Sequence, residues 1–261
     1  MRSLILALLF TSGCHYYFGD DDEPGADGDG DVTDDGSDDG ADGGDGVLDG
    51  GVAEPDAPVV CDPATALPEG YRPVAEVSAG AVTNEPDATL PDVFTTIVDA
   101  SAGGSAGQAT QPFVYLDLEA EGGAGKLEID DVASFESTDW DIALKRFVIR
   151  SNSGDSGPAD AEVASVQSKE LTFDDDVPSD RFSDDDWVSS DCVLEQANGG
   201  PRTRFSNWYR VQAGRFEAQP VVHLVRLGAG RYAEIDVVTY YGDEADPNKS
   251  GVYVLHWRRF P

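Results

Sequence analysis

The feature that most constrains the fold is a succession of short apolar or alternating runs that begins after Pro73 and continues almost to the C-terminus. Alternation of this kind indicates β-strands, and no run continues into a clean helical period. Glycine-rich sequences separate the runs, which is typical of tight turns. The sequence therefore predicts an all-β, predominantly antiparallel domain with long loops. The runs span residues 74–77, 93–98, 113–118, 126–129, 141–150, 221–227, 231–241 and 252–259.

The most distinctive pattern lies at residues 138–158, T-D-W-D-I-A-L-K-R-F-V-I-R-S-N-S-G-D-S-G-P. The part from Ile142 to Arg150 alternates, which predicts a strand with one buried face, and Trp140 is expected in the core. The Ser, Asn and Gly residues that follow predict a sharp turn. The last three runs of the chain are expected to form a meander, with a tight hairpin at residues 227–231.

Written as W-D-I-A-x-x-R-x-x-I-R-x-N-S-G-x-S-G-P, this stretch resembles the signature of the HmuY family of haem-binding lipoproteins. The strand F-V-Y-L-D-L-E before it and the C-terminal meander are also similar to that family. The resemblance covers roughly residues 112–260. It implies a HmuY-like all-β domain over residues 63–261 and a non-enzymatic protein that binds haem or a related tetrapyrrole for uptake, together with a haem-uptake receptor as partner.

The residues that would bind haem iron depart from the family. By resemblance, the axial ligands are two His or Met side chains in the middle of the domain, yet residues 161–222 contain neither. Met1 is the single methionine, and the histidines are His15, His223 and His256. Three hypotheses remain open: His223 and His256 bind the iron, a tyrosinate such as Tyr209 does so, or haem is not the ligand. Each histidine is otherwise interpreted as a residue on a sheet face.

Residues 161–219 form a long segment with a weak strand pattern. Two Asp triplets lie in it, at 174–176 and 184–186. A long irregular insertion between strands is more often functional than structural, so we expect it to wall a ligand site. Basic side chains that could pair with haem propionates, or with nearby aspartates, are Arg202, Arg204, Arg258 and Arg259.

The N-terminus predicts export. Arg2, the apolar residues 4–10 and the small residues before Cys14 resemble a lipoprotein signal peptide over residues 1–14. Cys14 is then the lipid anchor that attaches the protein to the membrane. His15 follows it instead of Asp, which by resemblance to other lipoproteins implies the outer membrane or cell surface. An ordinary signal peptide is the alternative.

Residues 15–62 are predicted to be a disordered acidic linker. Residues 20–56 contain sixteen Asp and Glu and no Lys or Arg, so they repel one another and have little to bury. The net charge of −34 excludes nucleic acid as a partner. Residues 27–31, D-G-D-G-D, are similar to the start of a calcium loop, but Val32 stands where that loop needs Gly. We expect weak calcium association at most.

The remaining cysteines form an even pair, because lipidation removes Cys14. In an exported protein Cys61 and Cys192 are therefore candidates for a disulfide, although sequence alone leaves their pairing open.

Residues 154–158, G-D-S-G-P, mimic the nucleophile motif of trypsin-like proteases. That chemistry needs a His base, and the one His before Ser156 is His15 in the linker. A structural turn is the favoured interpretation, and no catalytic residues are predicted. The sequence thus supports a haem-binding lipoprotein first. The alternative is a tethered interaction or structural lipoprotein that retains the fold without haem ligands.

Overall fold

The computed structural model describes residues 60–90, 92–166, 179–242, 246 and 248–260. The predicted signal peptide, Cys14, His15, the calcium-like sequence and nearly all of the acidic linker lie outside the described residues, as does the Asp triplet at 174–176. The described residues belong to the unit Pro55–Pro261. No helix in this described part is long and apolar enough to cross a membrane.

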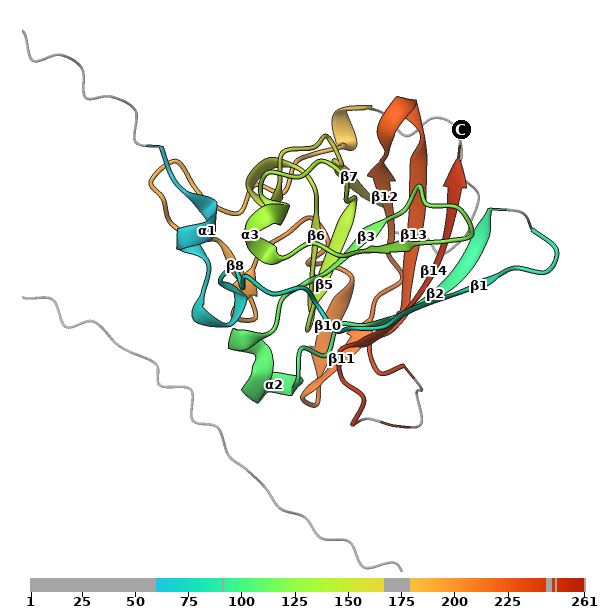
Figure 1. Ribbon diagram of the computed structural model, residues 1–261, viewed down its shortest axis with the longest axis horizontal. Coiled ribbons are helices and arrows are strands. Elements are labelled where there is room, and N and C mark those ends of the chain that lie inside the picture. Colours follow the sequence, from blue (N-terminus) through green and yellow to red (C-terminus); the bar gives the residue numbers. More distant parts are fainter. Residues whose placement is uncertain (1–59, 91, 167–178, 243–245, 247, 261) are drawn as a thin grey trace, which may run out of the picture. The chain divides into compact units, whose positions relative to one another are not determined.

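Two antiparallel sheets of six and four strands contain most of the strands in the described chain, which confirms the predicted fold class (Figure 1). The six-stranded sheet has the order β1-β2-β14-β13-β12-β7, and the four-stranded sheet has the order β4-β3-β5-β6. The predicted meander is present, because β12, β13 and β14 pair in sequence order. The first sheet comprises β1 (Val82–Pro86), β2 (Val93–Asp99), β7 (Val163–Val166), β12 (Val222–Arg226), β13 (Tyr232–Thr239) and β14 (Val252–Phe260). The second comprises β3 (Val114–Asp117), β4 (Gly125–Leu127), β5 (Ile142–Lys145) and β6 (Val148–Ser151).

Short elements complete the described chain. Two hairpins pair β8 (Gln196–Ala197) with β9 (Gly200–Pro201) and β10 (Tyr209–Gln212) with β11 (Arg215–Ala218). The α-helices are single turns: α1 (Pro63–Ala66), α2 (Gly104–Gly107) and α3 (Asp131–Ser134). The 3-10 turns are η1 (Glu69–Tyr71), η2 (Gln108–Thr110), η3 (Gly154–Ser156), η4 (Ser179–Arg181) and η5 (Gly228–Gly230).

The main core lies between the inner faces of the two sheets. Leu144 of β5 belongs to the same buried cluster as Ile235 of β13 and Leu255 of β14. A second cluster covers the other face of the four-stranded sheet and contains Trp140, which is fully buried as predicted. Both faces of β5 and β6 are therefore inside the protein, and burial of this apolar surface is the main stabilising contribution.

The predicted strand over residues 141–150 is wrong in one respect, because it is a hairpin. Ile142 pairs with Ser151, and the chain reverses at Arg146, whose φ is +51°. Tertiary contacts hold this conformation: the Arg146 amide donates to Ala100 O, and its guanidinium donates to Ser101 O and Ser250 O. The expected strand at 74–77 is also absent, since Val77 makes only an isolated bridge to Asp130.

The Ser, Asn and Gly turn after β6 is a network of buried hydrogen bonds. The Asn152 amide donates to Ser137 O and Trp140 O at 3.0 and 2.7 Å. A side chain on Gly157 would collide with Asn152 Oδ1, which explains why glycine is needed there. The turn is therefore structural, as the sequence indicates.

Asp185 of the second Asp triplet is a fully buried acceptor in the same network. Its Oδ2 accepts from the Ser151 amide at 2.8 Å and from Ser156 Oγ at 3.0 Å, and its Oδ1 accepts from the Arg204 amide at 2.6 Å. Burial raises the pKa of Asp185 to about 6, although these hydrogen bonds oppose the rise. One carboxylate thus joins β6, the turn after it and the loop at residue 204.

A disulfide joins Cys61 and Cys192, which are 131 positions apart in the sequence. It attaches the start of the described chain to the loop before β8.

We predict that Asp185→Ala lowers the free energy of unfolding at pH 7.5 by about 2 kcal/mol, because two buried amides lose their acceptor while a costly buried charge is removed. Urea denaturation followed by tryptophan fluorescence measures this. Asp186→Ala is the matched control, since Asp186 is exposed and should change stability by less than about 0.5 kcal/mol. Equal effects of the two substitutions would contradict the role of Asp185.

The cost of Asp185→Ala should also depend on pH. The folded-state pKa of about 6 lies above the ordinary value of 3.8, so Asp185 stabilises the fold most below pH 4, and this contribution is lost as pH rises to about 6. The substitution should therefore cost about 2 kcal/mol more at pH 4.5 than at pH 7.5. Paired urea titrations at the two pH values compare wild type and variant. A cost that is larger at pH 7.5 would refute the raised pKa.

Removing the disulfide should destabilise the domain, because a cross-link across 131 residues restricts the unfolded chain. We expect the Cys61→Ser, Cys192→Ser double variant to lose about 3 to 5 kcal/mol. Urea denaturation of this variant measures the loss, with wild type under reducing conditions as a second arm. Unchanged stability in both arms would show that the bond does not constrain the unfolded chain.

Candidate functional site

The two predicted iron ligands do not come together. His223 and His256 lie on β12 and β14, on either side of β13. His223 is opposite Ile235, which faces the core between the sheets, whereas His256 is opposite Asp236, which lies on the outer face. The imidazoles therefore point to opposite faces of one sheet and cannot bind the same iron ion. This placement disfavours the hypothesis that His223 and His256 bind the iron together, and it agrees with their interpretation as residues on sheet faces.

His223 is a buried histidine that supports its neighbours. Its ring is fully buried, stacks on Phe205 at 4.5 Å and places Nε2 2.9 Å from Asn207 Oδ1. Because an amide oxygen only accepts, Nε2 carries the proton and donates it. Nδ1 is buried and has no hydrogen-bond partner among the described residues. Burial lowers the pKa of His223 to about 3, so the ring is neutral at physiological pH.

Tyr209, the predicted tyrosinate, is also used within the fold. Its hydroxyl accepts a hydrogen bond from Asn198 Nδ2 at 2.9 Å, and its ring packs against Phe147 and Phe216. Burial raises the pKa of the Tyr209 hydroxyl, which disfavours the ionised form that binds iron.

Arg258 and Arg259, which were expected to pair with propionates or with local acids, have partners in the domain. Arg258 forms an ion pair with Glu234 at 2.9 Å, and Glu234 is buried. Arg259 donates to the carbonyl oxygens of Glu119 and Ala120 and lies over the ring of Phe94. These contacts favour the structural interpretation of both residues.

A candidate ligand site is the pocket lined by Arg181, Arg202 and Arg204, and we call it the arginine pocket. Its volume is about 440 Å³. Its lining comes from β7, from the chain around η4 and from residues 197–207, which is the region expected to wall a ligand site. The other described lining residues are Val163, Ser165, Ser183, Ala197, Thr203, Ser206 and Asn207, and no described lining residue is acidic.

The fold places this lining through the buried network. The Arg204 amide donates to Asp185, and Thr203 Oγ1 donates to Ile149 O of β6 at 2.6 Å. Ser183 is fixed to β7 by two backbone hydrogen bonds with Val163. Sequence analysis singled out Arg202 and Arg204 but missed Arg181, Ser165 and Asn207, because no local pattern shows that these residues converge.

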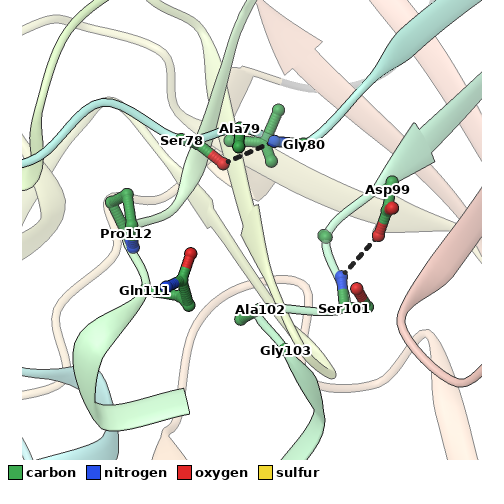
Figure 2. A pocket seen from close by; sticks show the side chains of 11 residues that line it. Ser78, Ala79, Gly80, Asp99, Ser101, Ala102, Gly103, Gln111 and Pro112 are labelled. Atoms are coloured by element: carbon green, nitrogen blue, oxygen red, sulfur yellow. Dashed lines mark hydrogen bonds between the residues drawn. The ribbon is translucent and has the colours of Figure 1, made fainter. Parts of the chain in front are cut away.

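Other hollows are less suited to a ligand. The pocket in Figure 2 is small, with a volume of about 150 Å³. Two of its polar side chains already bind backbone amides of the same lining, since Ser78 Oγ accepts from the Gly80 amide and Asp99 Oδ1 accepts from the Ser101 amide. A second pocket, of about 540 Å³, is lined by several prolines. A third pocket, of about 570 Å³, is lined by arginines together with three acidic residues.

The site residues do not fit haem iron as the family resemblance implies. None of these four pockets is lined by His, Met, Cys or Tyr, the usual axial donors. Within residues 60–90, 92–166, 179–242, 246 and 248–260, no three His, Cys, Asp or Glu side chains cluster in a way that could hold a metal ion.

Ser156 is not arranged as a nucleophile. It is fully buried, donates its hydroxyl proton to Asp185 Oδ2 and accepts from Trp187 Nε1 at 3.0 Å. A serine nucleophile needs a neighbouring base and access to substrate, and Ser156 has neither histidine nor solvent beside it.

Comparison with known proteins gives one decisive match. The family described as HmuY protein matches residues 109–254, which is more than half of the chain. No curated protein matches the sequence.

Solved structures give distant similarities. A proposed lipoprotein from Bacteroides fragilis is 17% identical, with 66% of this chain and 94% of that chain covered and a TM-score of 0.41. A proposed HmuY-like haem-binding protein from Bacteroides vulgatus is 15% identical, with 70% and 97% covered and a TM-score of 0.44. The apo form of a HmuY analogue from Tannerella forsythia is 15% identical, with 71% and 98% covered and a TM-score of 0.35.

The family match covers the pattern at residues 138–158, the arginine pocket and most of the C-terminal meander. This chain belongs to the HmuY family.

Proposed function

We propose that this protein is a non-enzymatic binding lipoprotein of the cell envelope that retains the HmuY fold without a pair of haem iron ligands. The observation that carries the proposal is the placement of its histidines. His223 is buried and bound to Asn207, while His256 lies on the opposite face of the sheet. Because the described pockets offer no axial donor, the ligand is recognised by other chemistry.

The N-terminal sequence supports a tethered, exported protein. A lipidated Cys14 would anchor the chain, residues 15–62 would act as the acidic spacer, and residues 63–261 would form the binding domain. The Cys61–Cys192 disulfide is consistent with export, since such bonds persist in oxidising compartments. We infer the outer membrane or cell surface as the location.

A haem carrier that serves an uptake receptor is the second candidate, and one observation favours it. His256 is partly exposed on the outer sheet face, directly opposite Asp236 on β13 and Thr95 on β2, so a single imidazole is available there. Haem or a related tetrapyrrole held at this face would have one protein ligand from β14.

Titration of the mature protein with haemin separates the two candidates. We expect no sharp Soret band at one equivalent in either the oxidised or the reduced state, because the described residues bring no pair of axial ligands together. His256→Ala is the informative variant, since the side chain is partly exposed and its removal should leave the fold intact. A sharp stoichiometric band that His256→Ala abolishes would overturn the proposal and establish the haem carrier.

A further inference from the structure

We propose that the arginine pocket binds an oxyanion, namely a small ligand that carries carboxylate or phosphate groups. This inference rests on the proposed binding function and names the ligand class of the site. It concerns Arg181, Arg202 and Arg204 together with the hydroxyl and amide groups between them.

The first argument is the local reversal of charge. The chain has 51 Asp and Glu against 17 Lys and Arg, so a pocket lined at random would contain more acidic than basic residues. Among the described residues, the lining of this pocket has three arginines and no carboxylate. A cationic hollow in a strongly anionic protein attracts anions locally while the rest of the surface repels them.

The second argument is that the guanidinium groups remain available. Arg202 meets Glu195 at 3.6 Å, and both side chains are more than half exposed, so the pair is weak and easily displaced. Arg204 donates from Nε to the carbonyl oxygen of Asp184, and its terminal nitrogens make no hydrogen bond or ion pair with the described residues. Arg181 makes no ion pair within the described part of the chain.

The third argument is a positioned neutral donor. His223 donates Nε2–H to Asn207 Oδ1, and Ser165 Oγ lies 3.5 Å from the same oxygen. With Oδ1 occupied, the Asn207 NH₂ group is the free end of the amide, and no described residue accepts from it. His223 is therefore a positioning residue, which fixes a donor at the pocket from inside the core.

The lining also indicates what kind of ligand fits. Guanidinium groups bind carboxylate and phosphate through paired N–H donors, and serine, threonine and asparagine add further donors. The apolar residues in the described lining are Val163 and Ala197, so this part of the pocket offers an aromatic ligand no ring to stack on. A volume of about 440 Å³ suits a small polycarboxylate or a phosphate compound.

Isothermal titration of the full mature protein with citrate, pyrophosphate and glucose at constant ionic strength tests the proposal. We expect citrate or pyrophosphate to bind at one site and glucose not to bind. The two anions separate carboxylate from phosphate as the source of the charge. Absence of binding by both anions would overturn the proposal.

Variants locate the site. The Arg202→Gln, Arg204→Gln double substitution should weaken anion binding by at least about tenfold, since two charge-assisted contacts are lost. Arg210→Gln is the matched control, because Arg210 is exposed on β10, pairs with Glu217 and lies outside the pocket. Equal weakening by Arg210→Gln would show a general charge effect and refute the site.

Asn207→Asp tests the positioned donor without removing the support from His223. The new carboxylate still accepts from Nε2–H, so thermal stability should stay close to that of wild type. Its negative charge should weaken citrate or pyrophosphate binding by at least about tenfold. Anion affinity that is unchanged in this folded variant would remove Asn207 from the site. The haemin titration tests the proposed function, whereas the anion titrations test the ligand class. A negative result in one experiment therefore does not decide the other.

Discussion

The hydrogen bonds to the buried carboxylate of Asp185 are the interaction on which the arrangement of this part of the domain depends. The carboxylate gathers amide or hydroxyl donors from β6, from the turn after β6 and from the loop at Arg204. Burying a carboxylate is unfavourable unless several donors form hydrogen bonds with it. Burial raises the pKa of Asp185 to about 6, while the hydrogen bonds oppose this rise. Two segments more than thirty residues apart in sequence are thereby held in one arrangement.

The same network determines where the candidate ligand site forms. Asp185 fixes the backbone of Arg204, Ile149 fixes Thr203, and His223 fixes Asn207 from the core side. Buried hydrogen bonds thus hold the chain that lines the arginine pocket, while the three arginine residues are exposed. Preorganised donors of this kind lower the ordering cost of binding.

The central motif is a fold signature, which explains why it predicts the family better than the ligand. Arg146 holds the β5–β6 turn, Asn152 holds Trp140, and Ser156 supports Asp185 and Trp187. Arg150 lies buried over Phe113 and donates to Tyr115. None of these side chains lines the arginine pocket. The motif can therefore identify the family without indicating which ligand the pocket binds.

By itself the sequence determined the all-β class, the C-terminal meander, the buried Trp140 and the HmuY family, because strand alternation and turn residues are local properties. Only the tertiary structure decided that residues 141–150 fold back as a hairpin, since the positive φ of Arg146 depends on Ala100, Ser101 and Ser250. It also decided the opposite directions of the two histidines. Their sequences, V-V-H-L-V-R and V-L-H-W-R-R, look alike, but the face of each side chain follows from strand register, which is a long-range pairing.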